Sequence, residues 1–250
     1  MEALELAGLT VEYGALRAVD GVDLKIERGE VRGLVGPNGS GKSTMLNAIS
    51  GLTRISGGAA VLGGQDVTGE SPFALARRGV SRTFQLVRLL AGLTVADNVY
   101  LGALTLGGEG GSRIGGIVRG GAHARRVRAR VEEAMERAGV AQFASLLADE
   151  LPFGIQRRVE IARAIVGEPE LLLLDEPAAG LSIGDLEDLG AVIQAEAARG
   201  CTVILVDHHL HFVVEHCPRT AVLNFGRLIF DGASTGLTSD QAVKEAYVGT

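Results

Sequence analysis

One loop constrains the fold of this chain more than any other feature: Gly36, Pro37, Asn38, Gly39, Ser40, Gly41, Lys42 and Ser43. It follows a short apolar run, Val31–Val35, and precedes a helical pattern that opens with Thr44. This order is typical of a phosphate-binding loop, because glycines let backbone N–H groups face an anion and the helix adds its positive N-terminal end. We expect the loop residues and Thr44 to bind a nucleoside triphosphate. Lys42 would contact its β- and γ-phosphates, and the Ser43 hydroxyl would ligate Mg²⁺.

A second apolar run, Leu171–Leu174, ends in two carboxylates, Asp175 and Glu176. Ligands of α/β proteins bind at the carboxyl ends of the strands, so we expect both side chains beside the phosphate-binding loop. There Asp175 would hold Mg²⁺ through water, and Glu176 would polarise the water that attacks the nucleotide. Taken alone, the segment could also be a solvated acidic turn.

Strand-like runs, among them Val80–Phe84, Thr202–Val206 and Ala221–Phe225, alternate with helical stretches along much of the chain. This alternation predicts an α/β fold with a mainly parallel sheet. The strand-like N-terminal residues 4–13 precede this pattern, and residues 86–166 are mainly helical. We expect one domain, 1–250, in which 1–85 and 167–250 form the core with a β-subdomain and 86–166 form a helical subdomain. The glycine-rich stretch Gly107–Gly121 is expected to be mobile.

Composition restricts the possible functions. The net charge of −6 argues against a protein that coats nucleic acid. The two cysteines, Cys201 and Cys217, have no metal-type spacing and favour a reducing compartment. We find no signal peptide and no run of about 18 apolar residues, so any work at a membrane requires another chain to cross it.

Together these segments resemble, in order and spacing, the ATP-binding subunit of ABC transporters over essentially the whole chain. The resemblance implies the P-loop ABC ATPase fold: a mainly parallel core sheet, an N-terminal antiparallel β-subdomain and a helical subdomain. It also rests on an adenine-stacking aromatic residue, a glutamine loop, a signature loop, a D-loop and a switch histidine. The matching residues, in that order, are Tyr13; Gln85; Leu151, Pro152, Phe153, Gly154, Ile155 and Gln156; Gly180, Leu181 and Ser182; and His208.

The resemblance implies a mechanism. Two such subunits, alike or different, pair head to tail, and ATP lies between the phosphate-binding loop of one and the signature loop of the other. Gln85 reaches Mg²⁺ and reports the γ-phosphate to two membrane permease subunits, whose coupling helices dock on the helical subdomain. The resemblance assigns catalysis to Glu176, His208 and Lys42. Such a subunit lies peripherally on the cytoplasmic side of the inner membrane.

Four positions depart from the commonest family pattern: Pro152, Ile155, Ser182 and His209. Pro152 replaces a serine whose hydroxyl would contact the γ-phosphate, although a proline suits the start of a helix. Our hypothesis is that the ATP site completed by this loop is the weaker of two in a heterodimer.

Four further segments resemble the branched-chain amino-acid uptake group, which usually includes a periplasmic substrate-binding protein: Arg82–Arg88, Leu93–Val99, Gly154–Arg163 and Ala246–Gly249. Relatives for urea or short amides and the lipopolysaccharide-export ATPase are similar. Three rival functions are a soluble, non-transport ABC ATPase, a P-loop kinase and an ATP-binding regulator. A non-transport ABC ATPase usually has two cassettes or long insertions. A P-loop kinase would not need a signature loop and a switch histidine, and Glu176 and His208 argue against a regulator that binds ATP without hydrolysing it.

Three more features have plainer explanations. The histidines 208, 209, 211 and 216 could form a metal site, but a switch histidine beside surface histidines explains them better. The arginines 125, 126, 128 and 130 could touch phosphates, but we expect the solvated face of a helix that carries Val127 and Val131. Pro72–Arg78 could face a partner or pack on the core.

Overall fold

The computed structural model describes residues 2–104 and 122–248, so the predicted Gly107–Gly121 segment lies outside the described residues. Within this part, the longer strands form two sheets, an antiparallel one ordered β2-β1-β4-β5 and a mixed one ordered β10-β9-β3-β8-β7-β6. The strands are β1 Glu2–Tyr13, β2 Leu16–Glu27, β3 Val31–Val35, β4 Gly57–Leu62, β5 Gln65–Asp66, β6 Val80–Arg82, β7 Leu171–Asp175, β8 Thr202–Val206, β9 Arg219–Asn224 and β10 Arg227–Ala233. The helices are α1 Lys42–Ile49, α2 Pro72–Arg77, α3 Val95–Ala103, α4 Ala122–Arg137, α5 Phe153–Ile165, α6 Ile183–Ala198, α7 Leu210–His216 and α8 Gln241–Val248, with the short 3₁₀ turns η3 Ala141–Phe143, η4 Ala148–Glu150 and η5 Ser234–Gly236.

The mixed sheet is the centre of the molecule. Its strands β6, β7, β8, β3 and β9 are parallel, and β10 alone pairs antiparallel, as the sequence predicted for a mainly parallel core. Every residue of β3, β7 and β8 is buried, because helices or the second sheet cover both faces. This explains why these strands read as unbroken apolar runs rather than as alternating ones.

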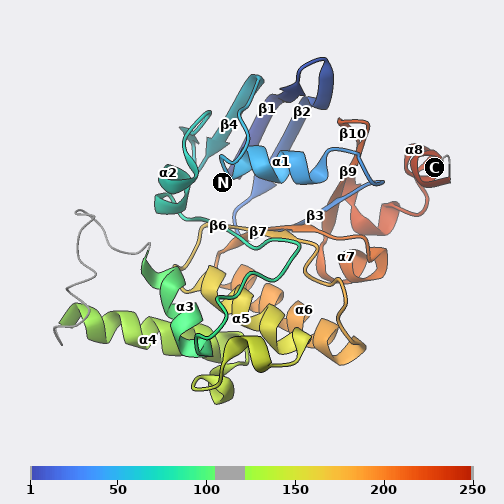
Figure 1. Cartoon of the computed structure of the whole chain (residues 1–250). Coiled ribbons are helices and arrows are strands. Elements are labelled where there is room, and N and C mark those ends of the chain that lie inside the picture. The colour runs from blue at the N-terminus through green and yellow to red at the C-terminus, as the bar shows by residue number, and fades with distance from the viewer. Residues whose placement is uncertain (1, 105–121, 249–250) are drawn as a thin grey trace.

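Two hydrophobic layers lie on opposite faces of that sheet. On β7, Leu171 and Leu173 pack with α1 and the antiparallel sheet, whereas Leu172 and Leu174 pack with the helices on the other side. Figure 1 shows this arrangement, with α1 between the two sheets and α3 to α6 beneath the mixed sheet. The carboxyl ends of β3, β7 and β8 therefore open at one edge, between α1 and the helical layer.

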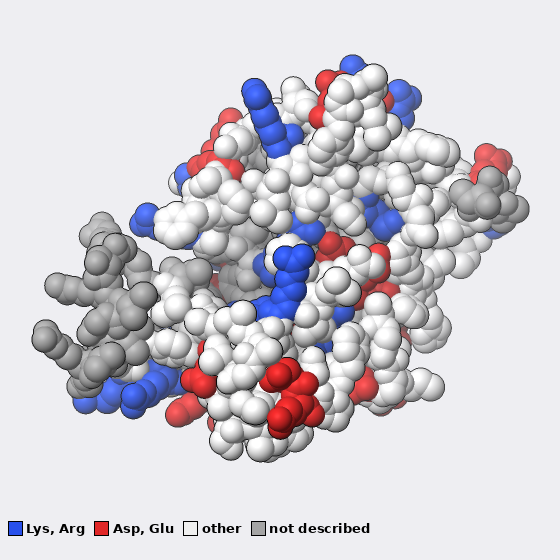
Figure 2. Space-filling view, in the orientation of Figure 1, with Lys and Arg blue, Asp and Glu red and all other residues white. Residues whose placement is uncertain are grey.

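The described segment between β6 and β7 is helical. In α4, Val127 and Val131 are buried, while Arg125, Arg126 and Arg128 are exposed, which confirms a solvated basic face. The fourth predicted residue, Arg130, is partly exposed and pairs with Glu168 (3.6 Å). Figure 2 shows both basic and acidic side chains on this face of the molecule, in small separate groups of one sign.

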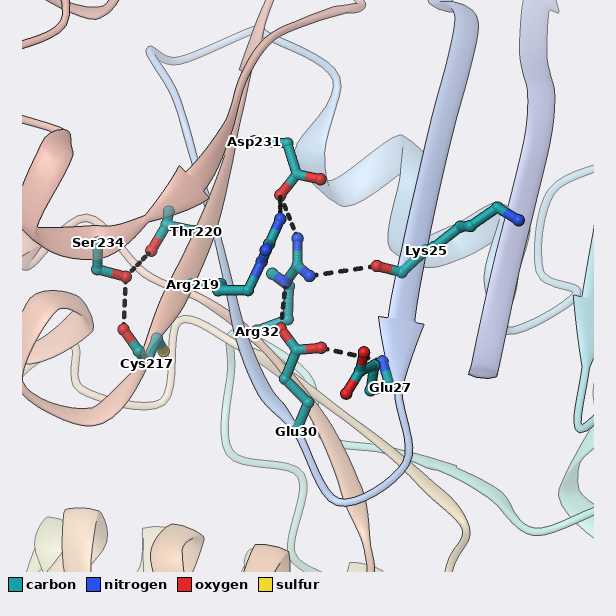
Figure 3. A network of polar contacts seen from close by, with 9 residues as sticks. All are labelled: Lys25, Glu27, Glu30, Arg32, Cys217, Arg219, Thr220, Asp231 and Ser234. Carbon is teal, nitrogen blue, oxygen red and sulfur yellow. Dashed lines mark hydrogen bonds and ion pairs between the residues drawn. The ribbon is translucent and has the colours of Figure 1, made fainter. Parts of the chain in front are cut away.

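A polar network joins the two sheets (Figure 3). Arg32 of β3 has only 2% of its surface exposed. Its guanidinium donates to Glu30 Oε1 (2.7 Å), to the Asp231 carboxylate of β10 and to the carbonyl of Lys25 in β2 (3.2 Å). A buried arginine is tolerated only when its donors are satisfied, and this one connects strands of both sheets. The network lies at the end of β3 opposite to the glycine loop.

Candidate active site

The glycine-rich loop leaves β3 and enters α1 in a conformation that requires its glycines. Gly36 and Gly41 have φ values of 148° and 107°. A Cβ atom at Gly36 would lie 2.1 Å from the carbonyl oxygen of Leu223, and one at Gly41 would lie 2.4 Å from that of Ala18. Side chains are therefore excluded at both positions by backbone conformation and by backbone neighbours.

Lys42 is held inside the loop, with 6% of its surface exposed. Its Nζ donates to the carbonyls of Gly36 (2.7 Å) and Pro37 (2.9 Å). Burial lowers the pKa of Lys42, and the charges of Glu176 and Asp175 oppose that shift. Ser43, the next residue, is exposed and its hydroxyl is open to a ligand.

Asp175 ends β7 and is paired with an arginine that sequence reasoning assigned no role. Arg82 Nη2 lies 2.8 Å from Asp175 Oδ2, and both side chains are about 8% exposed. Nη1 of the same guanidinium donates to Asn47 Oδ1 of α1 (2.7 Å) and to the Oγ of Ser50, the residue after α1 (3.0 Å). Arg82 thus connects α1, β6 and β7, and it neutralises the carboxylate that we predicted to bind Mg²⁺.

Glu176 is the meeting point of the predicted catalytic residues. Gln85 Nε2 donates to its Oε2 (2.7 Å), and His208 Nε2 lies 2.6 Å from its Oε1. The backbone of Glu176 has φ +50°, a left-handed conformation that is uncommon for a residue with a side chain and often marks a functional position. Segments far apart in the sequence therefore converge on one carboxylate.

An open pocket of about 550 Å³ lies over the loop. It gathers ten residues predicted for nucleotide binding or catalysis: Tyr13, Asn38, Gly39, Ser40, Gly41, Lys42, Ser43, Thr44, Glu176 and His208. Gly36 and Pro37 form the loop base, where Lys42 contacts their carbonyls. Gln85 contacts the pocket residue Glu176, and Asp175 is the residue before Glu176 in the chain. The lining suits a nucleoside triphosphate, because it includes the glycine loop and Lys42, which can bind phosphates, and the aromatic Tyr13, which can contact a base.

The signature loop and the D-loop lie together but do not line this pocket. A Cβ atom at Gly154 would lie 2.3 Å from Asp185 Oδ1, and one at Gly180 would lie 3.4 Å from the Phe153 ring. Ser182 caps α6 in a reciprocal capping box with Asp185, which gives this departure from the family pattern a structural role. A proline suits the first residue of a helix, but Pro152 is the residue before α5. The helix begins one residue later, at Phe153.

Sequence reasoning also missed Asp207, which is 1% exposed. Its Oδ2 accepts a hydrogen bond from the backbone N–H of Ala178 (2.9 Å), and its Oδ1 accepts one from that of His209 (2.9 Å). These bonds fix the end of β8 against the segment after β7, and so fix His208 against Glu176. A carboxylate directly after the apolar run Thr202–Val206 was the available signal.

The histidines do not form a metal cluster. Within residues 2–104 and 122–248, no group of three or more His, Cys, Asp or Glu side chains is arranged to hold a metal ion. His208 contacts Glu176, His209 contacts Asp207, and His211 is 96% exposed. A histidine metal site therefore has no support in the described residues.

The parallel sheet, the glycine loop at the carboxyl end of β3 and the carboxylates that follow β7 define a P-loop nucleoside triphosphatase. The family model described as ABC transporter matches residues 19–179, which is more than half of the chain. The chain therefore belongs to the ABC transporter family and is an ATP-binding and ATP-hydrolysing subunit.

Curated relatives cover nearly the whole chain. The high-affinity branched-chain amino acid transport ATP-binding protein BraF of Pseudomonas aeruginosa is 36% identical, over 98% of this chain and 97% of the relative. The protein of the same description, LivG, of Escherichia coli is 34% identical over the same shares.

Solved structures agree with the fold. A nucleotide-free ATP-binding cassette from an ABC transporter superposes with a TM-score of 0.87 at 28% identity, covering 100% of both chains. A dimeric post-hydrolysis state of another cassette, bound to ADP and Pi, has a TM-score of 0.77 at 26% identity, covering 92% of this chain and 98% of that one. Among the described residues no helix is both long and apolar enough to span a bilayer.

Proposed function

We propose that this subunit powers import of branched-chain amino acids or related small amides, on the cytoplasmic side of the inner membrane. Two permease subunits would form the path, and a periplasmic substrate-binding protein would deliver the solute. Two relatives, BraF and LivG, are described as branched-chain amino acid transport ATP-binding proteins, which supports this choice. The signature loop and ending that we compared with this group support it as well.

Within the site, the loop N–H groups and Lys42 bind the phosphates, and Tyr13 stacks on the base. Ser43, Gln85 and Asp175 are the residues that would hold Mg²⁺, and hydroxyl, amide and carboxylate oxygens suit that ion. Bound there, Mg²⁺ would neutralise phosphate charge. Glu176 orients and polarises the attacking water, and His208 donates to the developing charge on the γ-phosphate.

We infer that the site is completed by a second ATPase subunit. The signature loop Leu151–Gln156 lies outside the pocket formed by the phosphate-binding loop of its own chain. A head-to-tail pair would bring the N-terminal end of α5 of one subunit over the γ-phosphate held by the other. The relative solved as a dimer with ADP and Pi supports this arrangement.

One observation carries the catalytic assignment: Glu176 lies between Gln85 and His208 at the edge of the pocket. We expect Glu176→Gln to lower ATP turnover by about 10²-fold or more, as removal of a key transition-state group does. ATP binding should persist, because the loop and Lys42 are untouched. Turnover and ATP binding should be measured in parallel, with the exposed Glu187→Gln as control. Equal turnover in wild type and Glu176→Gln would remove the assigned role.

A further inference from the structure

A buried arginine of α5 holds the backbone of the segment that carries Gln85. Arg157 has 1% of its surface exposed. Its Nη1 donates to the carbonyl of Phe84 (2.9 Å) and its Nη2 to the carbonyl of Gln85 (2.8 Å). Both carbonyls come after Arg82, the last residue of β6 that pairs with β7. The pairing of these strands therefore does not include them. Arg157 therefore supplies their hydrogen bonds.

Glu160, one helical turn further along α5, holds the other end of the same segment. Its Oε1 accepts from the backbone N–H of Arg88 (3.4 Å), while its Oε2 pairs with Arg157 Nη1 (2.9 Å). Burial raises the pKa of Glu160, and the positive charge of Arg157 opposes that shift. Residues 84–88 are thus bound at both ends by one turn of α5, which leaves the Gln85 side chain directed at Glu176.

The same arginine also contacts the signature loop. Its Cζ lies 5.6 Å from the centre of the Phe153 ring, and Phe153 opens α5 directly after Pro152. One guanidinium therefore touches both the Gln85 backbone and the signature loop. Stability is a weak explanation for a charge pair this deeply buried, because burial often costs more than the pairing returns.

We propose that Arg157 and Glu160 are positioning residues that join Gln85 and the signature loop into one rigid unit, so that displacing one displaces the other. The inference rests on the proposed roles of Gln85 and the signature loop. A nucleotide that engages Gln85 in one subunit would thereby shift the signature loop of the same subunit, which faces the second nucleotide. The two nucleotide sites of a dimer would be coupled through each α5.

The chain offers a matched control. Arg137 of α4, whose side chain is 13% exposed, and the buried Glu196 of α6 form another arginine–glutamate pair (3.2 Å). Arg137 also donates to a backbone carbonyl, that of Ile165 (3.2 Å). None of these contacts reaches residues 84–88. Arg157→Met and Arg137→Met thus each remove an arginine–glutamate pair and a bond to a backbone carbonyl from the helical layer, and only the first releases the Gln85 segment.

Hydrogen exchange tests the contact without reference to activity. In the full chain, Arg157→Met should raise amide exchange of peptides covering residues 84–90 by about tenfold, as expected for loss of charged hydrogen bonds. Arg137→Met should leave these peptides unchanged. If Arg157→Met does not fold, Arg157→Lys keeps the charge beside Glu160 and loses the fork that holds two carbonyls. Unchanged exchange at 84–90 in the folded variant would refute the proposal.

A double-mutant cycle then tests whether the pair acts through Gln85. Arg157→Met should lower ATP turnover of the assembled transporter at least tenfold when Gln85 is present, and less than twofold in a Gln85→Ala background. Arg137→Met should change turnover by the same factor in both backgrounds. Equal factors for Arg157→Met would overturn the inference. Failure of the proposed function would be a separate result, because it would show as equal ATP turnover in wild type and Glu176→Gln, without any change at Arg157.

Discussion

Pro152 stands at the position that the resemblance to the family matched with a serine. The residue precedes α5 with φ −53° and ψ 147°, and no side chain caps the helix there. A serine in this conformation would accept a hydrogen bond from the first turn and could also reach a phosphate that a second subunit holds. This position therefore affects both the start of α5 and the chemistry of the site.

We expect Pro152→Ser to increase ATP affinity or turnover of the assembled transporter by about tenfold, because a hydrogen bond to a charged group is worth roughly 1.5–3 kcal/mol. Stability should hardly change. A serine cap contributes about 1 kcal/mol, and loss of the proline's restriction of the unfolded chain costs about 0.4–1 kcal/mol. ATP titration and thermal unfolding measure the two effects. No gain in affinity or turnover would count against a weakened site.

The sequence alone was sufficient to assign a role to site residues whose chemistry depends on their neighbours in the chain. Lys42 and Ser43 are set by the loop, and Glu176 by the end of an apolar run. Arg82 and Arg157 could not be assigned a role this way, because their partners lie 93 and 72 residues away. Nothing local distinguishes these buried arginines from the exposed ones in α4.

At the scale of elements, strands covered on both faces were predicted best. The expected runs coincide with β3 and β8, whereas β6 ends at Arg82, short of the predicted Phe84. The reason is that Arg157 of α5 takes the carbonyl of Phe84. β9 begins earlier than predicted, at Arg219, because its polar first residue still pairs with Arg32 of β3.

Close packing of α3 against α5 gives a second prediction. A Cβ atom at Gly102 would lie 2.0 Å from the carbonyl oxygen of Arg163 and 2.8 Å from Val166. Gly102→Ala should therefore push the helices apart and destabilise the fold by about 1–3 kcal/mol. Thermal or denaturant unfolding measures the change.

Gly184 of α6 is the matched control, because a Cβ atom there meets nothing within 4 Å. Gly184→Ala should leave stability unchanged or raise it by up to about 1 kcal/mol, since alanine favours helix. Similar losses in both variants would mean that the effect is not due to α3–α5 packing.

On the scale of the whole molecule, the parts of the active site are divided between two layers. The phosphate-binding loop and the carboxylates belong to the mixed sheet and α1, whereas the signature loop begins a helix of the opposite layer. Gln85 lies in the connection between them. The sequence pattern predicted each layer, but which side chains hold them together depends on contacts that only the folded chain contains.

The helical layer also makes stability depend on pH through Glu196, which is 2% exposed. One of its oxygens pairs with Arg137, and the other, Oε1, is buried without a hydrogen-bond partner among the described residues. Burial raises the pKa of Glu196 above its ordinary value of 4.5, against the opposing charge of Arg137. The folded chain therefore holds this proton more tightly than the unfolded chain does.

That difference fixes the sign of the pH dependence. The contribution of Glu196 is fully present below pH 4.5 and is lost as the pH rises through the raised value. Glu196→Gln removes this titration, so the stability of wild type minus that of the variant should fall between pH 4.5 and neutrality. Glu160, whose pKa burial also raises, is present in both chains and cancels in the subtraction. Denaturant unfolding of both proteins across this range measures the difference, and a value independent of pH would show that Glu196 ionises equally in the folded and unfolded chain.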